Sequence, residues 1–293
     1  MSYILETKGL TKCFGGFTAV DHVDLHIEKG AVYGLIGKNG AGKTTVLRLI
    51  AGLIQPSEGR VEFPLGRPGI GILLETPGLY MNMSAFDNLE IKRIALGTGS
   101  PADSSRLLEF VGLSQWAHVR AGSFSLGMRQ RLGIALALTG DPELLILDEP
   151  INGLDPNGIA DVRRMIKDIA RDGRKTILIS SHILEELSKT AHVFGVLKDG
   201  VLTGEITEDE LSSSSVGYIR FMLDDMAAAK EVLERMGIYS YQQKGDHLLL
   251  VMEQIHRSGD MIREFVLNGV HVSGCETIHE SLEDFYIGHT KEG

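Results

Sequence analysis

A glycine-rich octapeptide places the tightest constraint on what this chain can fold into. An apolar run from Ala31 to Gly37 leads into the octapeptide, and Lys43 to Ala51 after it has helical character. The octapeptide reads Gly37-Lys38-Asn39-Gly40-Ala41-Gly42-Lys43-Thr44. This is the spacing of a P-loop, whose glycines let backbone N–H groups surround phosphates at the positive end of a helix. The sequence therefore predicts a strand, a phosphate-binding turn and a helix in succession.

Two side chains of this turn suit a nucleotide and its metal ion. Lys43 is expected to contact the β- and γ-phosphates of ATP. The Thr44 hydroxyl is expected to bind Mg²⁺, a hard cation that prefers oxygen ligands. An ordinary glycine-rich turn is the alternative, but it does not explain the position between a buried strand and a helix. We therefore predict ATP and Mg²⁺ as cofactors.

A second apolar run ends in two acidic residues. Leu144 to Leu147 is followed by Asp148 and Glu149, which is a Walker B pattern. Asp148 is expected to hold Mg²⁺ through water, and Glu149 to polarise the water that attacks the γ-phosphate. Taken alone, such a run is equally typical of a plain strand end. Together with the P-loop it predicts an ATPase.

Short apolar strands alternate with helical stretches along the first 205 residues. Strands are expected near 69–74, 144–148, 176–180 and 193–197, and helices near 85–95, 104–111, 125–138, 156–171 and 183–190. This alternation predicts an α/β fold with a mainly parallel sheet covered on both faces. Polar and apolar residues alternate from His22 to Ile27, which predicts an additional antiparallel β layer.

The composition of the chain changes after Asp199-Gly200. The serine run 212–215 predicts a linker, which gives an ATPase domain at 1–211 and an accessory domain at 216–293. The second part is expected to follow the order strand, helix, strand, strand, helix, strand, as in a small ferredoxin-like α+β domain. A final helix is expected over 278–289.

Charge and composition restrict the partners. The chain carries 39 acidic and 29 basic residues, and its net charge of −10 repels phosphate backbones. The basic stretch from Arg163 to Lys175 contains Asp168 and Asp172, so it is more typical of a solvated helix face than of a nucleic-acid patch. We predict that nucleic acid is not a partner.

Cysteine usage and hydropathy indicate a cytoplasmic protein. Cys13 and Cys275 lie in no metal or redox spacing, so both are expected to be small buried residues in a reducing compartment. Residues 1–10 show no signal-peptide pattern, and the apolar stretch 132–140 is shorter than the roughly 20 residues needed to cross a bilayer. Any membrane attachment is expected to come through a partner.

A third motif narrows the class of P-loop protein. The segment Phe124-Ser125-Leu126-Gly127-Met128-Arg129-Gln130-Arg131 starts a predicted helix whose Ser and Gly suit a phosphate, although a plain Ser N-cap is the alternative. With Ser181-His182 and Gly153-Leu154-Asp155, it resembles the signature of the ABC ATPase family. The resemblance covers residues 4 to about 205. It implies a cassette with a parallel core sheet, an antiparallel β layer and a helical signature subdomain.

The resemblance also implies the roles of individual residues. His182 resembles the switch histidine that contacts the γ-phosphate, where a structural histidine is the alternative. Phe14 resembles the aromatic ring that stacks on adenine, where core packing is the alternative. Ser125 and Gly127 resemble the pair that closes over ATP held by a second subunit, so a homodimer or a dimer with a close paralogue is expected. The implied set is Lys43, Glu149 and His182 for catalysis; Phe14, Gly37, Lys38, Asn39, Gly40, Ala41, Gly42, Lys43, Thr44, Thr45, Ser125 and Gly127 for the nucleotide; and Thr44, Asp148 and Glu75 for the metal.

Two departures from the family pattern are informative. The signature has Phe124, Leu126 and Met128 where Leu, Gly and Gln are commonest, while the phosphate-facing Ser and Gly are kept. Glu75 stands at the position of the family's Q-loop glutamine, as in ATPases of the bacitracin and lantibiotic resistance group, which the segment 281–285 also resembles. The alternative without a functional role is that Glu75 is only a solvated loop carboxylate.

The resemblance implies a transport function. We expect export of a peptide antibiotic or other amphiphile, driven by an ATP-sandwiched dimer bound to separately encoded polytopic permease subunits at the inner face of the membrane. A soluble ABC ATPase acting on DNA or ribosomes is the rival, but the chain has no long coiled-coil insertion and no second cassette. A small-molecule kinase is a further alternative that has no need for the 124–128 motif.

Overall fold

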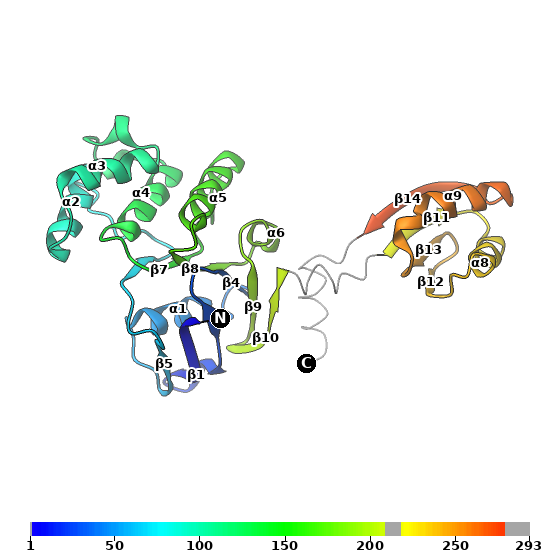
Figure 1. The fold of residues 1–293 in the computed structure, drawn as a ribbon, viewed down its shortest axis with the longest axis horizontal. Helices are drawn as coiled ribbons and strands as arrows, with labels where there is room; N and C mark the ends of the chain where they lie inside the picture. Colours follow the sequence, from blue (N-terminus) through cyan, green and yellow to red (C-terminus); the bar gives the residue numbers. More distant parts are fainter. Residues whose placement is uncertain (1, 209–217, 279–293) are drawn as a thin grey trace. The chain divides into compact units, whose positions relative to one another are not determined.

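The computed structural model describes residues 2–208 and 218–278. The chain divides into two compact units, Met1–Glu208 and Asp209–Gly293, each with its own core (Figure 1). The linker expected at 212–215, most of the helix expected at 278–289 and the segment 281–285 lie outside the described residues.

A six-stranded sheet forms the centre of the first unit. Its order is β10-β9-β4-β8-β7-β6, and all neighbours are parallel except the pair β10 and β9. The strands are β4 (Val32–Ile36), β6 (Ile70–Leu73), β7 (Leu144–Asp148), β8 (Thr176–Ser181), β9 (Val193–Lys198) and β10 (Val201–Thr207). Strands β4, β7 and β8 are buried along their whole length, as strands covered on both faces must be. This confirms the expected mainly parallel sheet.

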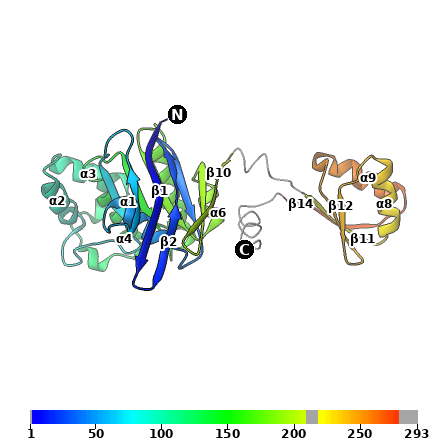
Figure 2. The ribbon, with the colours of Figure 1, turned by 90° about the horizontal axis from the view of Figure 1, so that it is seen from below.

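An antiparallel sheet packs over one face of the central sheet with a helix between them. It contains β1 (Tyr3–Phe14), β2 (Phe17–Val23), β3 (His26–Glu28) and β5 (Glu58–Glu62), and Figure 2 shows β1 and β2 as long neighbouring strands. Helix α1 (Lys43–Ala51) buries Leu47 and Ile50 in one core with Leu5 and Leu25 of the antiparallel sheet and Ile146 of the central sheet. The β layer expected from the alternation at 22–27 is therefore present.

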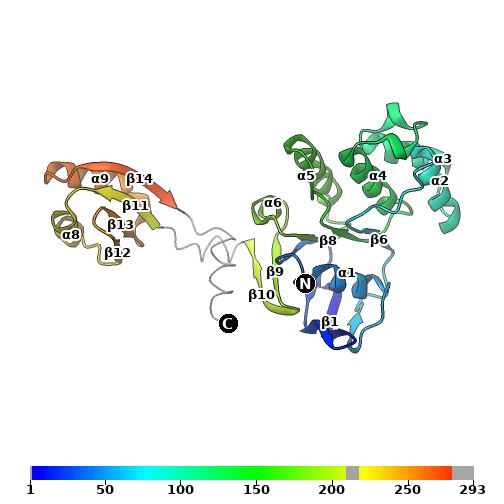
Figure 3. The ribbon, with the colours of Figure 1, turned by 180° about the vertical axis from the view of Figure 1, so that it is seen from behind.

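The other face of the central sheet carries the remaining helices. Helices α4 (Leu126–Leu138) and α5 (Pro156–Ala170) lie on the side opposite α1 (Figure 1). Helices α2 (Ala85–Leu96) and α3 (Pro101–Phe110) pack with α4 into a helical cluster near β6 (Figure 3). Short helical turns occupy Ser114–Trp116 and Ala121–Ser123, and a short helix α6 (Leu184–Ser188) follows β8. The cluster of α2, α3 and α4 is the helical subdomain that the family resemblance implied.

The second unit is a four-stranded antiparallel sheet with two helices. Its order is β12-β13-β11-β14, which is the arrangement of a split βαβ unit. The elements are β11 (Tyr218–Leu223), α8 (Met226–Arg235), β12 (Tyr241–Lys244), β13 (Leu248–Val251), the turn Ile255–Arg257, α9 (Ser258–Leu267) and β14 (Val272–Ile278). Phe221 and Phe265 meet edge to face in its core, with ring centroids 5.1 Å apart.

The expectation that Cys13 and Cys275 are buried is wrong, because both are exposed. Cys13 lies beside the turn of the β1–β2 hairpin, and Cys275 lies on β14, the edge strand of its sheet. Neither position has a layer packed over it.

None of the helices within residues 2–208 and 218–278 has the length and apolar character needed to span a bilayer.

Candidate nucleotide site

The P-loop turn has a shape that only glycine permits. Gly42 has φ +102°, and a Cβ atom there would lie 2.4 Å from the carbonyl oxygen of Ala19. Gly40 has φ +86°, and its missing side chain would point into open space. Helix α1 then starts without a side-chain cap and without an acidic residue in its first turn. Its first N–H groups and its positive end are therefore available to an anion.

A cavity of about 370 Å³ opens at this turn. Six residues of the predicted nucleotide set line it: Asn39, Gly40, Gly42, Lys43, Thr44 and Thr45. Glu75 and Glu149 line the same cavity, so the predicted phosphate, metal and catalytic groups meet there. Sequence reasoning missed three lining residues, Phe17, Ala19 and Asn152. Only the antiparallel pairing of β1 and β2 brings the first two to this position.

The aromatic side chains of the β1–β2 hairpin are both exposed. Phe14 is 51% exposed and does not line the cavity, so its interpretation as core packing is wrong. Phe17, its partner across the hairpin, is 64% exposed and does line the cavity. The Lys12 ammonium lies 5.2 Å from the Phe14 ring centroid. The contact of Phe14 with adenine stays a prediction, and Phe17 is a second candidate for it.

Glu149 contacts both Lys43 and His182, and the first two of these residues line the cavity. The Lys43 Nζ donates to the carbonyl oxygens of Gly37 at 2.7 Å and Lys38 at 3.2 Å, and it lies 3.1 Å from Glu149 Oε1. His182 Nδ1 lies 2.8 Å from Glu149 Oε2. Lys43 and Glu149 are each 6% exposed. Since a buried charge is costly without a partner, each of these two groups depends on the other.

The backbone of Glu149 adopts an unusual conformation. Its φ of +48° lies in the left-handed region, which costs a residue other than glycine about 1–3 kcal/mol. Ser180 on the neighbouring strand β8 holds this turn: its Oγ accepts from the Glu149 N–H at 3.0 Å and donates to Asp148 Oδ1 at 2.7 Å. Sequence reasoning missed Ser180. Its position at the carboxyl end of an apolar strand was the available signal, because parallel strand ends meet at one edge of a sheet.

Asp148 provides the test of whether Mg²⁺ fits. The residue is fully buried, and its Oδ2 has no hydrogen-bond partner among the described residues. An unpaired buried carboxylate oxygen is costly, and a cation or its bound water would satisfy it. Within residues 2–208 and 218–278, no group of three His, Cys, Asp or Glu side chains could hold a metal ion. The site therefore fits a cation that takes most of its ligands from phosphates, water and the Thr44 hydroxyl.

For Glu75 and the signature residues, the structure gives a position, and their ligand contacts stay predictions. Glu75 is exposed on the cavity wall, and its binding of metal stays a prediction. Ser125 caps α4 by accepting from the Met128 N–H at 3.2 Å, and its hydroxyl belongs to an exposed residue. Neither Ser125 nor Gly127 lines the cavity of its own chain. Their contact with a nucleotide across a dimer stays a prediction.

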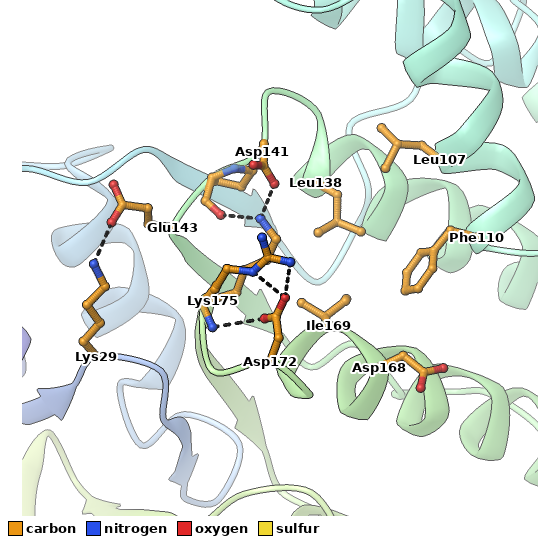
Figure 4. A pocket seen from close by; sticks show the side chains of 12 residues that line it. Lys29, Leu107, Phe110, Leu138, Asp141, Glu143, Asp168, Ile169, Asp172 and Lys175 are labelled. Carbon is orange, nitrogen blue, oxygen red and sulfur yellow. Dashed lines mark hydrogen bonds and ion pairs between the residues drawn. The ribbon is translucent and has the colours of Figure 1, made fainter.

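A second cavity, of about 640 Å³, has different chemistry (Figure 4). It lies before the amino-terminal ends of β7 and β8, whereas the P-loop cavity lies at the carboxyl ends. Its charged groups pair with one another: Lys29 with Glu143 at 3.3 Å, and Lys175 with Asp141 at 2.5 Å. The rest of its wall includes apolar side chains such as Leu138. A phosphate there would have to displace an existing carboxylate.

Sequence comparison matches this chain to known proteins along most of its length. A family profile described as "ABC transporter" matches residues 20–152, and one described as "AAA domain, putative AbiEii toxin, Type IV TA system" matches residues 117–188. The bacitracin transport ATP-binding protein BcrA of Bacillus licheniformis is 40% identical over 299 residues, covering 98% of this chain and 97% of BcrA. The lantibiotic transport ATP-binding protein SrtF of Streptococcus pyogenes is 42% identical over 218 residues, covering 72% of this chain and 93% of SrtF.

A solved structure agrees with these matches. The ADP conformation of MJ1267, an ATP-binding cassette of an ABC transporter, is 30% identical and has a TM-score of 0.64, covering 73% of this chain and 94% of MJ1267. The uncapped α1 start, the buried pair of Lys43 and Glu149 and this likeness in sequence and fold lead to one conclusion. The chain belongs to the ATP-binding subunits of ABC transporters and is an ABC-type ATPase.

Proposed function

We propose that this chain hydrolyses ATP to drive export of a peptide antibiotic or a similar amphiphile through separately encoded membrane subunits. One structural observation carries the coupling part of the proposal. In the loop after β6, Glu75 lines the nucleotide cavity, while its neighbours Leu74 and Thr76 line a different cavity of about 470 Å³. A movement of this loop on nucleotide binding therefore reaches both places.

The cavity of about 470 Å³ has the composition of a protein-binding surface. We call it the docking groove; it is lined by Leu53, Ile72, Leu73, Leu74, Thr76, Pro77, Gly78, Tyr80, Asn88, Ile91, Lys92, Ala95, Gly133 and Leu136. Most of these side chains are apolar, and Leu53 and Tyr80 are more than half exposed, at 53% and 57%. Apolar surface of this kind on a soluble unit is typical of an interaction site. We expect a cytoplasmic segment of a permease subunit to bind there, which places this chain at the inner face of the membrane.

The chemistry assigned to the site follows from its own side chains. Lys43 and the α1 N–H groups bind the phosphates, and Thr44 and Asp148 hold Mg²⁺, which neutralises phosphate oxygens when it is bound. Glu149 then orients and deprotonates the attacking water, and His182 positions the Glu149 carboxylate through the 2.8 Å contact. Ser125 and Gly127 complete the phosphate site across an ATP-bound dimer.

The names of two relatives support the substrate class. BcrA is described as a bacitracin transport protein and SrtF as a lantibiotic transport protein, and both cargoes are peptide antibiotics. A soluble ABC ATPase acting on DNA or ribosomes is the alternative, but it would not need an apolar groove that shares a loop with the nucleotide cavity.

Affinity purification from detergent-solubilised membranes tests the proposal. We expect a polytopic membrane protein to co-purify, and we expect the intact pair to raise the bacitracin concentration that the host survives. Glu149→Gln is the matched control, because it should assemble normally but give no protection. Recovery of soluble partners alone, or equal survival with the Glu149→Gln protein, would contradict the transport function.

A further inference from the structure

Among the described residues that line the docking groove, Lys92 is the one that carries a charge. It lies on α2 and is partly buried among apolar neighbours that include Ile91 and Leu136. Its Nζ donates to the carbonyl oxygen of Leu136 at 2.6 Å, in the last turn of α4. Burial lowers the pKa of the Lys92 ammonium below its ordinary value.

No acidic side chain of the described residues compensates this charge. No carboxylate within residues 2–208 and 218–278 lies within 4.0 Å of the Lys92 Nζ, and burial alone shifts its pKa. The next residue, Arg93, differs, because it forms an ion pair with Glu90 at 2.8 Å. Lys43 likewise has Glu149. A partly buried ammonium without an anion is the unusual case, since charged groups in apolar surroundings are normally paired.

Binding to the end of α4 explains only part of the Lys92 environment. A lysine near a helix C-terminus interacts favourably with the last carbonyl groups. An ammonium has three N–H donors, however, and the Leu136 carbonyl accepts one of them. If an apolar partner covered the groove, the other donors would lose water and gain nothing. A carboxylate on the partner removes that penalty.

We propose that the permease segment in the docking groove is apolar and carries one Asp or Glu whose carboxylate binds the Lys92 ammonium. This inference rests on the proposed function and adds the chemistry of the partner. The apolar wall supplies affinity for any apolar segment, whereas the single cation selects segments with an acidic side chain in register. Lys92 is then a residue that determines which membrane subunit the ATPase accepts.

Variants at Lys92 test the charge requirement in co-purification from membranes. Lys92→Glu should reduce the recovered membrane subunit by roughly tenfold or more, because two carboxylates would face each other in the groove. Lys92→Met keeps length and apolar contact and should also reduce recovery, since the partner's carboxylate is left without a cation. Lys92→Arg keeps the charge and should recover most of the assembly. Thermal unfolding of each purified variant shows whether it is folded.

Cross-linking distinguishes the inference from the docking proposal on which it rests. A water-soluble carbodiimide joins an amine directly to a carboxylate, so it should link Lys92 to one Asp or Glu of a membrane subunit in the assembled complex. A photoreactive residue at Leu53 or Ala95, on the groove wall, reports any partner regardless of charge.

Each result has a definite meaning. A photo-cross-link to a membrane protein without the carbodiimide link, together with normal assembly of Lys92→Met, overturns the acidic contact and leaves docking intact. A carbodiimide link from Lys92 to this chain's own acidic residue also overturns it. Absence of any cross-link from the groove to a membrane protein overturns the docking proposal itself.

Discussion

The nucleotide cavity and the core of the second unit bury opposite kinds of side chain. At the cavity, Lys43, Asp148, Glu149 and Ser180 are all at most 6% exposed. In the described residues 218–278, every buried side chain is apolar, and Phe265 is typical. Apolar burial stabilises a fold by about 1.5–3 kcal/mol for each large side chain, whereas a buried ion pair contributes little or nothing. Buried charge therefore marks the place where the molecule performs chemistry rather than the place where it gains stability.

The two named relatives match different shares of this chain. SrtF is matched along 93% of its length by 72% of this chain, a share close to that of residues 1–208. BcrA is matched by 98% of this chain.

The most severe change at the cavity is Lys43→Ala. It removes the cation that faces the phosphates and also leaves Glu149 buried without its partner. We expect loss of ATP binding and a fall in ATPase rate of at least about a hundredfold. Titration with a fluorescent ATP analogue and a phosphate-release assay measure both effects. Lys29→Ala is the control, because Lys29 pairs with Glu143 at the exposed, opposite end of the sheet. Equal ATPase rates for the two variants would show that Lys43 does not act in the nucleotide site.

Glu149→Gln separates binding from chemistry. The amide keeps the shape of the side chain but is not a base, so hydrolysis should fall by about 10²–10⁴-fold while ATP still binds. The blocked protein should accumulate as an ATP-bound dimer, which size-exclusion chromatography with light scattering detects. Glu143→Gln is the matched control. A Glu149→Gln protein that turns over ATP at the normal rate would show that another group is the base.

Changes at Glu75 should affect transport more than ATP binding. Glu75→Gln keeps an oxygen ligand and should preserve much of the function, whereas Glu75→Ala removes the ligand and should reduce transport several-fold. ATP affinity, ATPase rate and bacitracin survival are measured in parallel for both. If the Ala variant equals the original protein in all three, Glu75 is the solvated loop carboxylate of the alternative interpretation.

The smallest effect on the nucleotide site is expected from removing the second unit. A chain that ends at Ser213 keeps every residue of the cavity, and each of the two units has a core of its own. Its ATP affinity should stay within about twofold of the full chain, while assembly or regulation changes. A folded, shortened chain without ATP binding would show that the two units are not separable.

Most of the α/β fold was predictable, because each local signal matched its element. The helices over 85–96 and 126–138 begin within one residue of the expected positions, and both have a serine N-cap. Exposure was less predictable. Both cysteines were expected to be buried, yet the hairpin end and the edge strand leave them at the surface. Burial depends on which element packs above a position, and residue type sets only the average.

The sequence by itself determined the P-loop, the Walker B strand end and the signature helix start, because each motif is a contiguous segment whose backbone geometry comes from its own glycines and caps. Only the tertiary structure decided which distant groups meet. The parallel pairing of β7 with β8 brings Ser180 to Asp148 and Glu149, and the β1–β2 hairpin brings Phe17 to the cavity. The packing of α2 on α4 places the Lys92 ammonium at the Leu136 carbonyl, with no carboxylate of the described residues beside it. Contacts between separate elements depend on how sheets and helices pack, and no local spacing along the chain encodes that packing.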